Sequence, residues 1–204
     1  MNFTEEDLQN IRTAQDTGGD IWNNELLVDL KARIKRFYRT NGSEVCCYCR
    51  RDFQDEFNMV IDIEHILPKS KYEEYMFEMG NLNISCKRCN MPIKGEKDDF
   101  VVDKALIRTD YSVPQHYYFI HPNFDTYSNN LDHFRLVVNE AKITKYIAKT
   151  NKGRYTYDYF KLSKLEVDSL NQAQGIPSSE NDSVISDQAT AAIKESLEIL
   201  LSQL

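Results

Sequence analysis

The chain has 204 residues, of which 41% are hydrophobic and 28% are charged. This length predicts one or two domains, and the apolar content is high enough for a folded core, which excludes a chain that is disordered throughout. No run approaches the roughly 18 apolar residues of a membrane span, and the acidic N-terminus lacks the apolar stretch of a signal peptide. We therefore expect a soluble, cytoplasmic protein that has no membrane contact.

Charge and cysteine content narrow the class further. The 32 acidic and 25 basic residues give a net charge of -7, which argues against a general nucleic-acid coat protein but leaves room for a local basic groove. Four of the five cysteines form two Cys-x-x-Cys pairs. In a reducing compartment this spacing favours a metal site over disulfide bonds.

Periodicity and composition divide the chain into four stretches. We expect a helical N-terminal flank in residues 1–45 and a core that contains the cysteines in residues 46–100. Residues 101–172 are rich in tyrosine and predict a mixed C-terminal region. Residues 173–204 predict a polar linker and an amphipathic tail helix, because apolar residues recur there in steps of three and four. Together these stretches predict an α+β protein.

The N-terminal flank should contain two helices. Thr4 is followed by three acidic residues, which is typical of an N-cap and a first helical turn. Apolar residues at helical spacing between Asn24 and Thr40 predict a second helix with one buried face, and Asn41-Gly42 should end it.

Several short apolar runs predict strands. The first alternates apolar and polar residues and breaks at Pro68, and the second leads into the second cysteine pair. Two turns are predicted, at His121-Pro122-Asn123 and at Asn151-Lys152-Gly153. The predicted strands lie within residues 60–70, 80–85, 117–120 and 136–138.

The two cysteine pairs predict a structural zinc site. Cys46 and Cys49 form the first pair, and Cys86 and Cys89 form the second. A gap of two residues lets both sulfurs of a pair reach one ion, and two pairs complete a tetrahedral site that leaves no position open for catalysis. Cys47 is the spare cysteine, and we expect it to pack as a small apolar residue.

The first predicted strand carries the most informative polar residues. Because side chains alternate along a strand, Asp62 and Glu64 should share one face while His65 takes the other. A buried carboxylate beside a histidine is unfavourable unless both have partners or a function. Asn81 precedes the second cysteine pair, and Asn90 follows it directly.

This combination resembles the HNH endonuclease family, the ββα-metal nucleases. The matching residues are the two cysteine pairs, Glu64-His65-Ile66-Leu67-Pro68, Asn81-Leu82, and Cys86-x-x-Cys89-Asn90 followed by Lys94-Gly95. The resemblance covers residues 46–98, about a quarter of the chain. It implies a zinc-clipped ββα-metal core between helical flanks.

The resemblance also implies a reaction, the hydrolysis of phosphodiester bonds in DNA that leaves 5′-phosphate and 3′-hydroxyl ends. In this family His65 would accept the proton of the attacking water, and Glu64 and Asn90 would bind one divalent ion. Asn81 would hold the histidine or its loop in place. Histidine suits general-base chemistry near neutral pH. Oxygen ligands suit Mg²⁺ or Mn²⁺ whereas sulfur ligands suit zinc, so two different metals are expected.

Three positions depart from the family pattern. Glu64 stands where aspartate is more common and is one methylene longer, which makes Asp62 an additional candidate ligand. Asn90 replaces the histidine of the strict motif. Lys94 follows Asn90 by four residues, where the family more often has three.

Two sets of basic residues are candidates for phosphate contacts. Lys31, Lys35 and Arg39 form an i, i+4 row on the second helix, which is either a solvated face or a contact to DNA. A second set lies near the motif and comprises Lys69, Lys71, Lys87, Arg88 and Lys94.

A second similarity concerns the C-terminal region. Residues 119–127 and 152–156 look like the C-terminal part of HNH proteins that are encoded beside ATPases in bacterial anti-phage systems, such as the Septu and retron-linked types. This implies an antiviral effector that an ATPase partner holds in check. The tail helix would dock on that partner or pack on its own domain.

Two other functions stay open at this point. A non-catalytic, zinc-stabilised module that binds nucleic acid or protein would need the cysteines but not Glu64-His65 with Asn81 and Asn90. An RNA-cleaving effector would use the same chemistry, because that chemistry acts on the phosphate.

Overall fold

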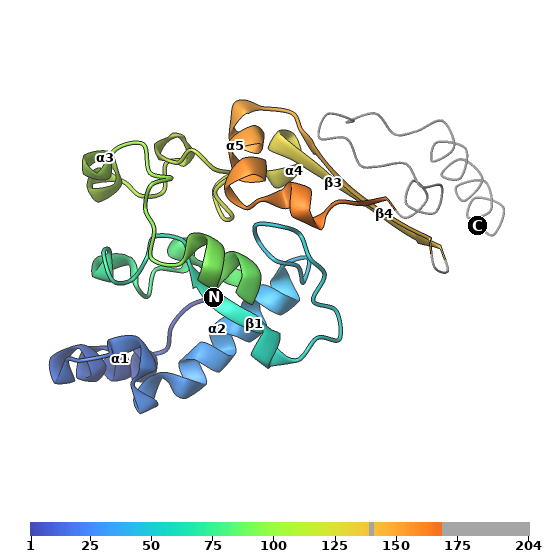
Figure 1. The fold of residues 1–204 in the computed structure, drawn as a ribbon. Coiled ribbons are helices and arrows are strands. Elements are labelled where there is room, and N and C mark those ends of the chain that lie inside the picture. The colour runs from blue at the N-terminus through green and yellow to red at the C-terminus, as the bar shows by residue number, and fades with distance from the viewer. Residues whose placement is uncertain (139–140, 169–204) are drawn as a thin grey trace. The chain divides into compact units, whose positions relative to one another are not determined.

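The computed structural model describes residues 1–138 and 141–168 (Figure 1). The chain separates into two compact units, Met1–Tyr127 and a second unit that begins at Ser128. The predicted linker and tail helix, residues 173–204, lie outside the described residues. The four-part division made from the sequence stays a prediction.

Two helices form the start of the first unit, as the sequence predicts. They are α1 (Glu5–Thr17) and α2 (Val28–Asn41). Thr4 caps α1 through a capping box with Asp7, which confirms the predicted N-cap. Helix α2 begins at Val28 rather than near Asn24. The reason is that the Asn24 side chain accepts a hydrogen bond from Leu26 N and starts a 3₁₀ turn instead.

A hydrophobic core joins these helices to the strands that follow. Ile11 and Ala14 of α1, Leu30 and Ile34 of α2, and Leu82 all belong to one buried cluster. Helix α2 contacts both strands of the next hairpin (Figure 1). This packing fixes α2 beside the segment that carries the candidate site.

The central feature of the first unit is a two-stranded antiparallel hairpin. Strand β1 (Ile61–His65) pairs with β2 (Leu82–Cys86), and Ile63 lies opposite Ile84. Strand β1 falls within the predicted segment 60–70, and β2 overlaps the predicted segment 80–85 and extends one residue further, to Cys86. A short π-helix, η6 (Cys89–Lys94), follows β2, so the order is strand, strand, helix.

The rest of the first unit is built from short helices and irregular segments. Residues 117–120 were expected to form a strand, but Tyr117 makes only an isolated bridge with Val101. Tyr117, Phe119 and Ile120 are nevertheless buried, so the apolar run reflects core packing and not sheet pairing. The short helices are η1 (Ile21–Asn23), η2 (Glu25–Leu27), η3 (Asn58–Val60), η4 (Glu73–Tyr75), η5 (Met79–Asn81), α3 (Lys104–Thr109) and η7 (Pro114–His116).

The second unit contains a three-stranded antiparallel sheet in the order β3-β4-β5. Its long hairpin confirms the strand predicted at residues 136–138 (Figure 1). Helix α5 contacts β4. The bounds are α4 (Tyr127–Asn130), β3 (Leu131–Val138), β4 (Ala141–Ala148), α5 (Asn151–Tyr159), η8 (Leu162–Leu165) and β5 (Val167–Asp168).

The predicted turn at Asn151-Lys152-Gly153 is instead the first turn of α5. Thr150 caps this helix by accepting a hydrogen bond from Gly153 N at 3.0 Å. Gly153 is needed for close approach: a Cβ at this position would lie 2.0 Å from the Asn130 carbonyl oxygen. The glycine that suggested a turn therefore serves helix packing.

We expect Gly153→Ala to lower the stability of the second unit. A glycine-to-alanine change inside a helix normally stabilises it by about 1 kcal/mol, but here the added methyl would overlap the Asn130 backbone, and overpacking costs about 1–3 kcal/mol. Thermal unfolding of the full chain would measure the change, with Arg154→Ala on the same helix as a control. A variant with a raised melting temperature would contradict this packing.

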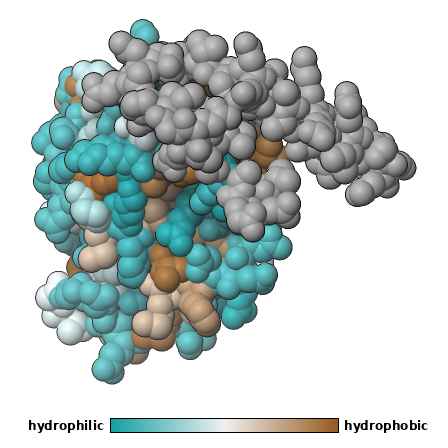
Figure 2. All heavy atoms as spheres, turned by 45° about the vertical axis from the view of Figure 1, so that its right-hand side comes forward, coloured by the Kyte–Doolittle hydropathy of each residue, from teal (hydrophilic) through white to brown (hydrophobic). Residues whose placement is uncertain are grey.

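The surface of the described chain is mainly hydrophilic on the face shown in Figure 2, and hydrophobic residues appear there as small patches. Among the described residues, no helix has both the length and the apolar character needed to cross a membrane.

Candidate functional site

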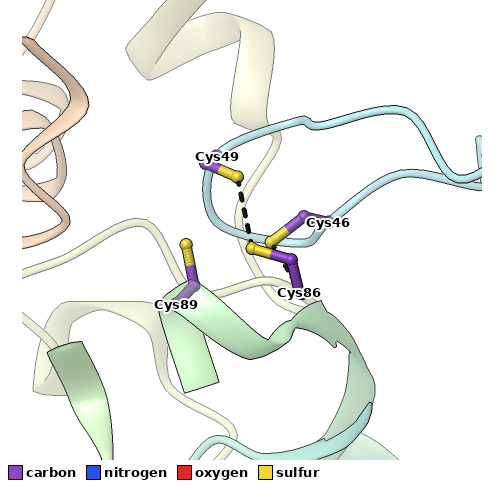
Figure 3. Close-up of side chains that lie close together, drawn as sticks. All are labelled: Cys46, Cys49, Cys86 and Cys89. Carbon is purple, nitrogen blue, oxygen red and sulfur yellow. Dashed lines mark hydrogen bonds between the residues drawn. The ribbon is translucent and has the colours of Figure 1, made fainter. Parts of the chain in front are cut away.

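Four cysteines converge to form a candidate metal centre. Cys46 and Cys49 come from the loop before β1, Cys86 ends β2, and Cys89 begins η6. Their four side chains are buried, and their Sγ atoms all lie within 4.8 Å of one another (Figure 3). The two Cys-x-x-Cys pairs therefore meet, as their spacing predicts.

The geometry of this cluster fits zinc. A zinc ion lies about 2.3 Å from each thiolate in a tetrahedral site, so neighbouring sulfurs should be about 3.8 Å apart. The Sγ atoms of Cys49 and Cys86 are 3.8 Å apart. A site closed by four sulfurs has no position left for a substrate, so an ion here would have a structural role.

The backbone around the first cysteine pair explains why the sulfurs face inward. Arg50 N donates to the Cys46 carbonyl, and Cys46 N donates to the Arg51 carbonyl, so the loop folds back on itself. Arg50 has a φ of 57°, a left-handed conformation that sharpens this turn. Cys47 is buried outside the four-sulfur cluster, as expected for a packing residue.

Glu64 lies in a closed polar pocket beneath η6. Its side chain is fully buried, and it accepts hydrogen bonds from Tyr48 Oη at 3.1 Å and from Ser85 Oγ at 3.3 Å. Lys94 Nζ lies 2.9 Å from Glu64 Oε1. Burial raises the pKa of Glu64, and the neighbouring Lys94 ammonium opposes that rise. Removing one partner of such a pair would cost about 3–5 kcal/mol, because the other charge would be left buried.

Lys94 is as deeply buried as its partner and does not face solvent. Its side chain is 1% exposed, and Nζ donates to the carbonyls of His65 at 2.7 Å and of Gly95 at 3.3 Å. The expectation that Lys94 contacts phosphate is therefore replaced by a structural role. It ties η6 to the end of β1.

The π-helix explains the unusual spacing between Asn90 and Lys94. Gly95 N donates to the Asn90 carbonyl at 2.7 Å, a bond between residues five apart that accommodates one more residue than an α-helical turn. Gly95 ends the element with a φ of 52°, which glycine adopts without strain. The additional residue lets Lys94 reach back to His65 while Asn90 stays at the start of the helix.

His65 lies on the opposite side of β1 from Glu64, as the alternation predicts. Its Nε2 lies 3.1 Å from the Met76 carbonyl oxygen, which can only accept, so Nε2 carries the proton and Nδ1 holds the free lone pair. The Trp22 ring stands edge-on with its centroid 4.3 Å from that of His65. Burial lowers the pKa of His65 to about 3, so the imidazole is neutral at pH 7.

Asn81 holds the loop that follows His65. Its Oδ1 accepts from Leu67 N at 2.7 Å, and its Nδ2 donates to the carbonyls of Leu67 and Tyr75. Its backbone carbonyl also accepts from Ile66 N. These contacts are those of a residue that positions a loop.

Asp62 and Asn90 meet at the other end of β1. Asn90 Nδ2 lies 3.0 Å from Asp62 Oδ2, and Lys87 Nζ lies 2.9 Å from Asp62 Oδ1. The Asp62 side chain is 21% exposed, in contrast to the closed pocket of Glu64. Of the two acidic residues on this face, the structure brings Asp62 to Asn90.

A cleft of about 1510 Å³ borders these residues. Asp62, His65 and Asn90 line it together with one side of α2. This volume exceeds the roughly 300–1,000 Å³ of small-molecule sites. Lys94 also lines the cleft but is buried and paired with Glu64. Without Lys94, five lining residues are basic and three are acidic, so the cleft is cationic although the chain is acidic; they are Lys31, Lys35, Arg36, Arg39 and Lys69, with Glu44, Asp62 and Glu96.

The basic row of α2, which consists of Lys31, Lys35 and Arg39, borders this cleft, but two of its side chains bond to residues outside the helix. Lys35 Nζ donates to the Ile61 carbonyl at 2.7 Å, and Arg39 forms an ion pair with Glu44. Arg36, which lies on the same side of the helix, is exposed. The row is therefore not a fully solvated face, and Arg36 is an exposed cation of α2 that lines the cleft and that the prediction omitted.

The other basic candidates near the motif have different environments. Lys71 pairs with Asp98 at 2.8 Å, and Lys87 pairs with Asp62. Arg88 approaches the zinc-site sulfur of Cys89 at 3.8 Å. Lys69 lines the cleft.

Trp22 is a cleft residue that sequence reasoning did not single out. It is the chain's single tryptophan, and its carbonyl accepts from Lys31 Nζ at 2.9 Å. It precedes the cysteine pairs by more than twenty residues, so no local motif connects it with His65. The only signal in the sequence that could have singled out Trp22 is that tryptophan occurs once in the chain.

The fold and the site together define an α+β protein with a buried cluster of four cysteines that could hold a metal ion, and with a cationic cleft. No known family profile matches the chain, and no solved structure matches it. The chain is similar to the Septu protein PtuB of Bacillus thuringiensis, with 28% identity over 164 residues. The match covers 80% of this chain and 49% of that protein, so the chain spans about half the length of this relative.

Proposed function

We propose that this chain is a metal-dependent HNH endonuclease that hydrolyses phosphodiester bonds of DNA. The observation that carries the proposal is the arrangement of the cleft. A neutral histidine with a free Nδ1, an acidic residue and an asparagine line one cationic cavity beside a zinc-type cysteine cluster. A binding module would need the cysteines and the basic side chains, but it would have no use for a fixed imidazole base.

In this proposal His65 Nδ1 accepts the proton of a water molecule that attacks the phosphorus. The bond between phosphorus and the 3′ oxygen then breaks, and the departing oxygen takes a proton from solvent water, which leaves a 5′-phosphate and a 3′-hydroxyl. Asn81 keeps the loop after His65 in place. An acidic residue of β1, Glu64 or Asp62, would hold Mg²⁺ or Mn²⁺ together with Asn90, and the ion would supply charge neutralisation at the phosphate and at the leaving oxygen.

The proposed biological role is antiviral defence together with an ATPase partner. Support comes from the similarity to the Septu protein PtuB and from the resemblance to HNH effectors that are encoded beside ATPases. The net charge of -7 suits an enzyme whose activity depends on a partner, because general attraction to DNA is weak.

The test is cleavage of supercoiled plasmid and of RNA by the zinc-loaded chain in Mg²⁺ or Mn²⁺, with and without an ATPase of the kind proposed as its partner. We expect ion-dependent cutting of DNA. Cutting of RNA alone would favour the RNA-cleaving alternative. Binding without cutting, in every ion and with the partner present, would favour the non-catalytic module.

We expect Arg36→Ala to weaken DNA binding and to reduce its salt dependence. Arg36 is exposed and lines the cleft, so it is placed for a phosphate contact. Each lost contact should lower the slope of log K against log salt by about 0.9. Binding would be measured in a His65→Ala background, to prevent cutting. Arg12→Ala, an exposed arginine on α1, is the control; equal slopes for both variants would remove Arg36 from the DNA interface.

A further inference from the structure

We infer that Asp62, and not Glu64, is the carboxylate that holds the divalent ion together with Asn90. This inference rests on the proposed function and assigns separate roles to two acidic residues on one face of β1. Its starting point is their different surroundings.

The surroundings of Glu64 are those of a closed ion pair. Its carboxylate is fully buried, and both oxygens already have partners: Lys94 and Tyr48 on Oε1, and Ser85 on Oε2. To bind an ion that also contacts substrate, the carboxylate would have to leave Lys94, whose ammonium is 1% exposed and would stay buried without its counter-charge.

The surroundings of Asp62 are those of an accessible ligand. The residue lines the cleft beside His65 and Asn90, and its side chain is 21% exposed. Lys87 occupies Oδ1 and is itself 53% exposed, so it can stay on that oxygen or move into solvent. Oδ2 faces Asn90 and is available to a cation.

The distance between Asp62 and Asn90 suits an octahedral ion. Mg²⁺ binds oxygen at about 2.1 Å, so two adjacent ligands of an octahedron lie about 3 Å apart. Asp62 Oδ2 and Asn90 Nδ2 are 3.0 Å apart. A half-turn of the Asn90 amide exchanges its nitrogen and oxygen, which would place Oδ1 as the second ligand.

This arrangement leaves the remaining positions of the ion for water and phosphate oxygens. Mg²⁺ commonly binds one or two protein carboxylates and keeps several waters. Glu64 then has a structural role, because it holds Lys94, and Lys94 holds the His65 carbonyl at 2.7 Å.

The test is Mn²⁺ binding to the full, zinc-loaded chain, measured from the electron paramagnetic resonance signal of free Mn²⁺. We expect Asp62→Asn and Asn90→Ala each to raise the dissociation constant at least about tenfold, since even the loss of an outer contact costs that much. Glu96→Gln removes a negative charge from the same cleft and should leave Mn²⁺ affinity nearly unchanged.

Glu64 is tested with its partner, so that no buried charge is left unpaired. The double variant Glu64→Gln/Lys94→Met should keep Mn²⁺ affinity, whereas Glu64→Gln alone should lower the melting temperature by about 6–20 °C. Loss of Mn²⁺ binding in a folded double variant, with binding retained in Asp62→Asn, would overturn the inference and leave the endonuclease proposal standing.

Two outcomes separate the inference from the proposed function. A wild-type chain that binds Mn²⁺ through Asp62 but cuts no nucleic acid supports the ion site and contradicts the endonuclease. If the zinc-loaded wild-type chain binds no Mn²⁺, both the ion site and the endonuclease proposal are overturned.

Discussion

Replacing His65 by alanine should lower the rate of DNA cleavage by about 10²–10⁴-fold while zinc content is kept. The imidazole is neutral, its proton is fixed on Nε2 by the Met76 carbonyl, and Nδ1 is the nitrogen able to accept a proton in the cleft. Alanine removes this base but leaves the four cysteines and the Glu64–Lys94 pair in place. The rate would be measured on supercoiled plasmid under single-turnover conditions in Mg²⁺.

Because His65 is largely buried, its variant needs a check of folding. Melting temperature and bound zinc should be measured beside the rate, and His65→Asn offers a second, polar replacement. His116→Ala is the matched control, since His116 contacts the Asp110 carbonyl and is not among the residues that line the cleft. A folded His65→Ala chain that cuts at the normal rate would remove His65 from the mechanism.

Replacing Cys46 by serine should release the metal and unfold the first unit. Structural zinc sites contribute about 10–16 kcal/mol of apparent binding free energy at pH 7, which is as large as the roughly 5–15 kcal/mol of stability of a typical domain. Cys46 also accepts a hydrogen bond from Cys86 N at 3.4 Å, so its loss affects the second pair. Zinc per chain and thermal unfolding are the measurements.

Cys47→Ser is the control for this prediction. Cys47 is adjacent in sequence and buried, but it lies outside the four-sulfur cluster. We expect it to keep one zinc per chain and to lose only the stability that a buried hydroxyl costs. If Cys46→Ser kept its zinc and its melting temperature, the four cysteines would not form a structural metal site.

The cysteine cluster was predictable because its geometry is local. Two residues between paired cysteines bring both sulfurs to one side of a tight turn, and a backbone hydrogen bond from Cys47 N to the Ile84 carbonyl joins the first turn to β2, which leads into the second. Side-chain alternation likewise placed Asp62 and Glu64 on one face and His65 on the other. Both rules depend on spacing within a few residues.

Other features depended on contacts that spacing does not describe. The apolar run at residues 117–120 has the composition of a strand, but it packs in a core without a partner strand. The segment that ends in Gly153 has the composition of a turn, but Gly153 lies in a helix that approaches the Asn130 backbone. The apolar residues correctly indicated burial at 117–120, and the glycine correctly indicated a tightly packed position at 153. In both cases the predicted backbone conformation was wrong.

The sequence by itself determined the zinc-type cysteine set, the hairpin that connects it and the side of the strand on which each polar residue lies, because these follow from the short-range periodicity of the backbone. Only the tertiary structure decided which acidic residue is closed off by Lys94 and which one lines a cationic cleft with His65 and Asn90. That choice depends on how η6 packs against the hairpin and how α2 packs beside β1, and such long-range packing is set by the complementary shapes and charges of segments far apart in the chain.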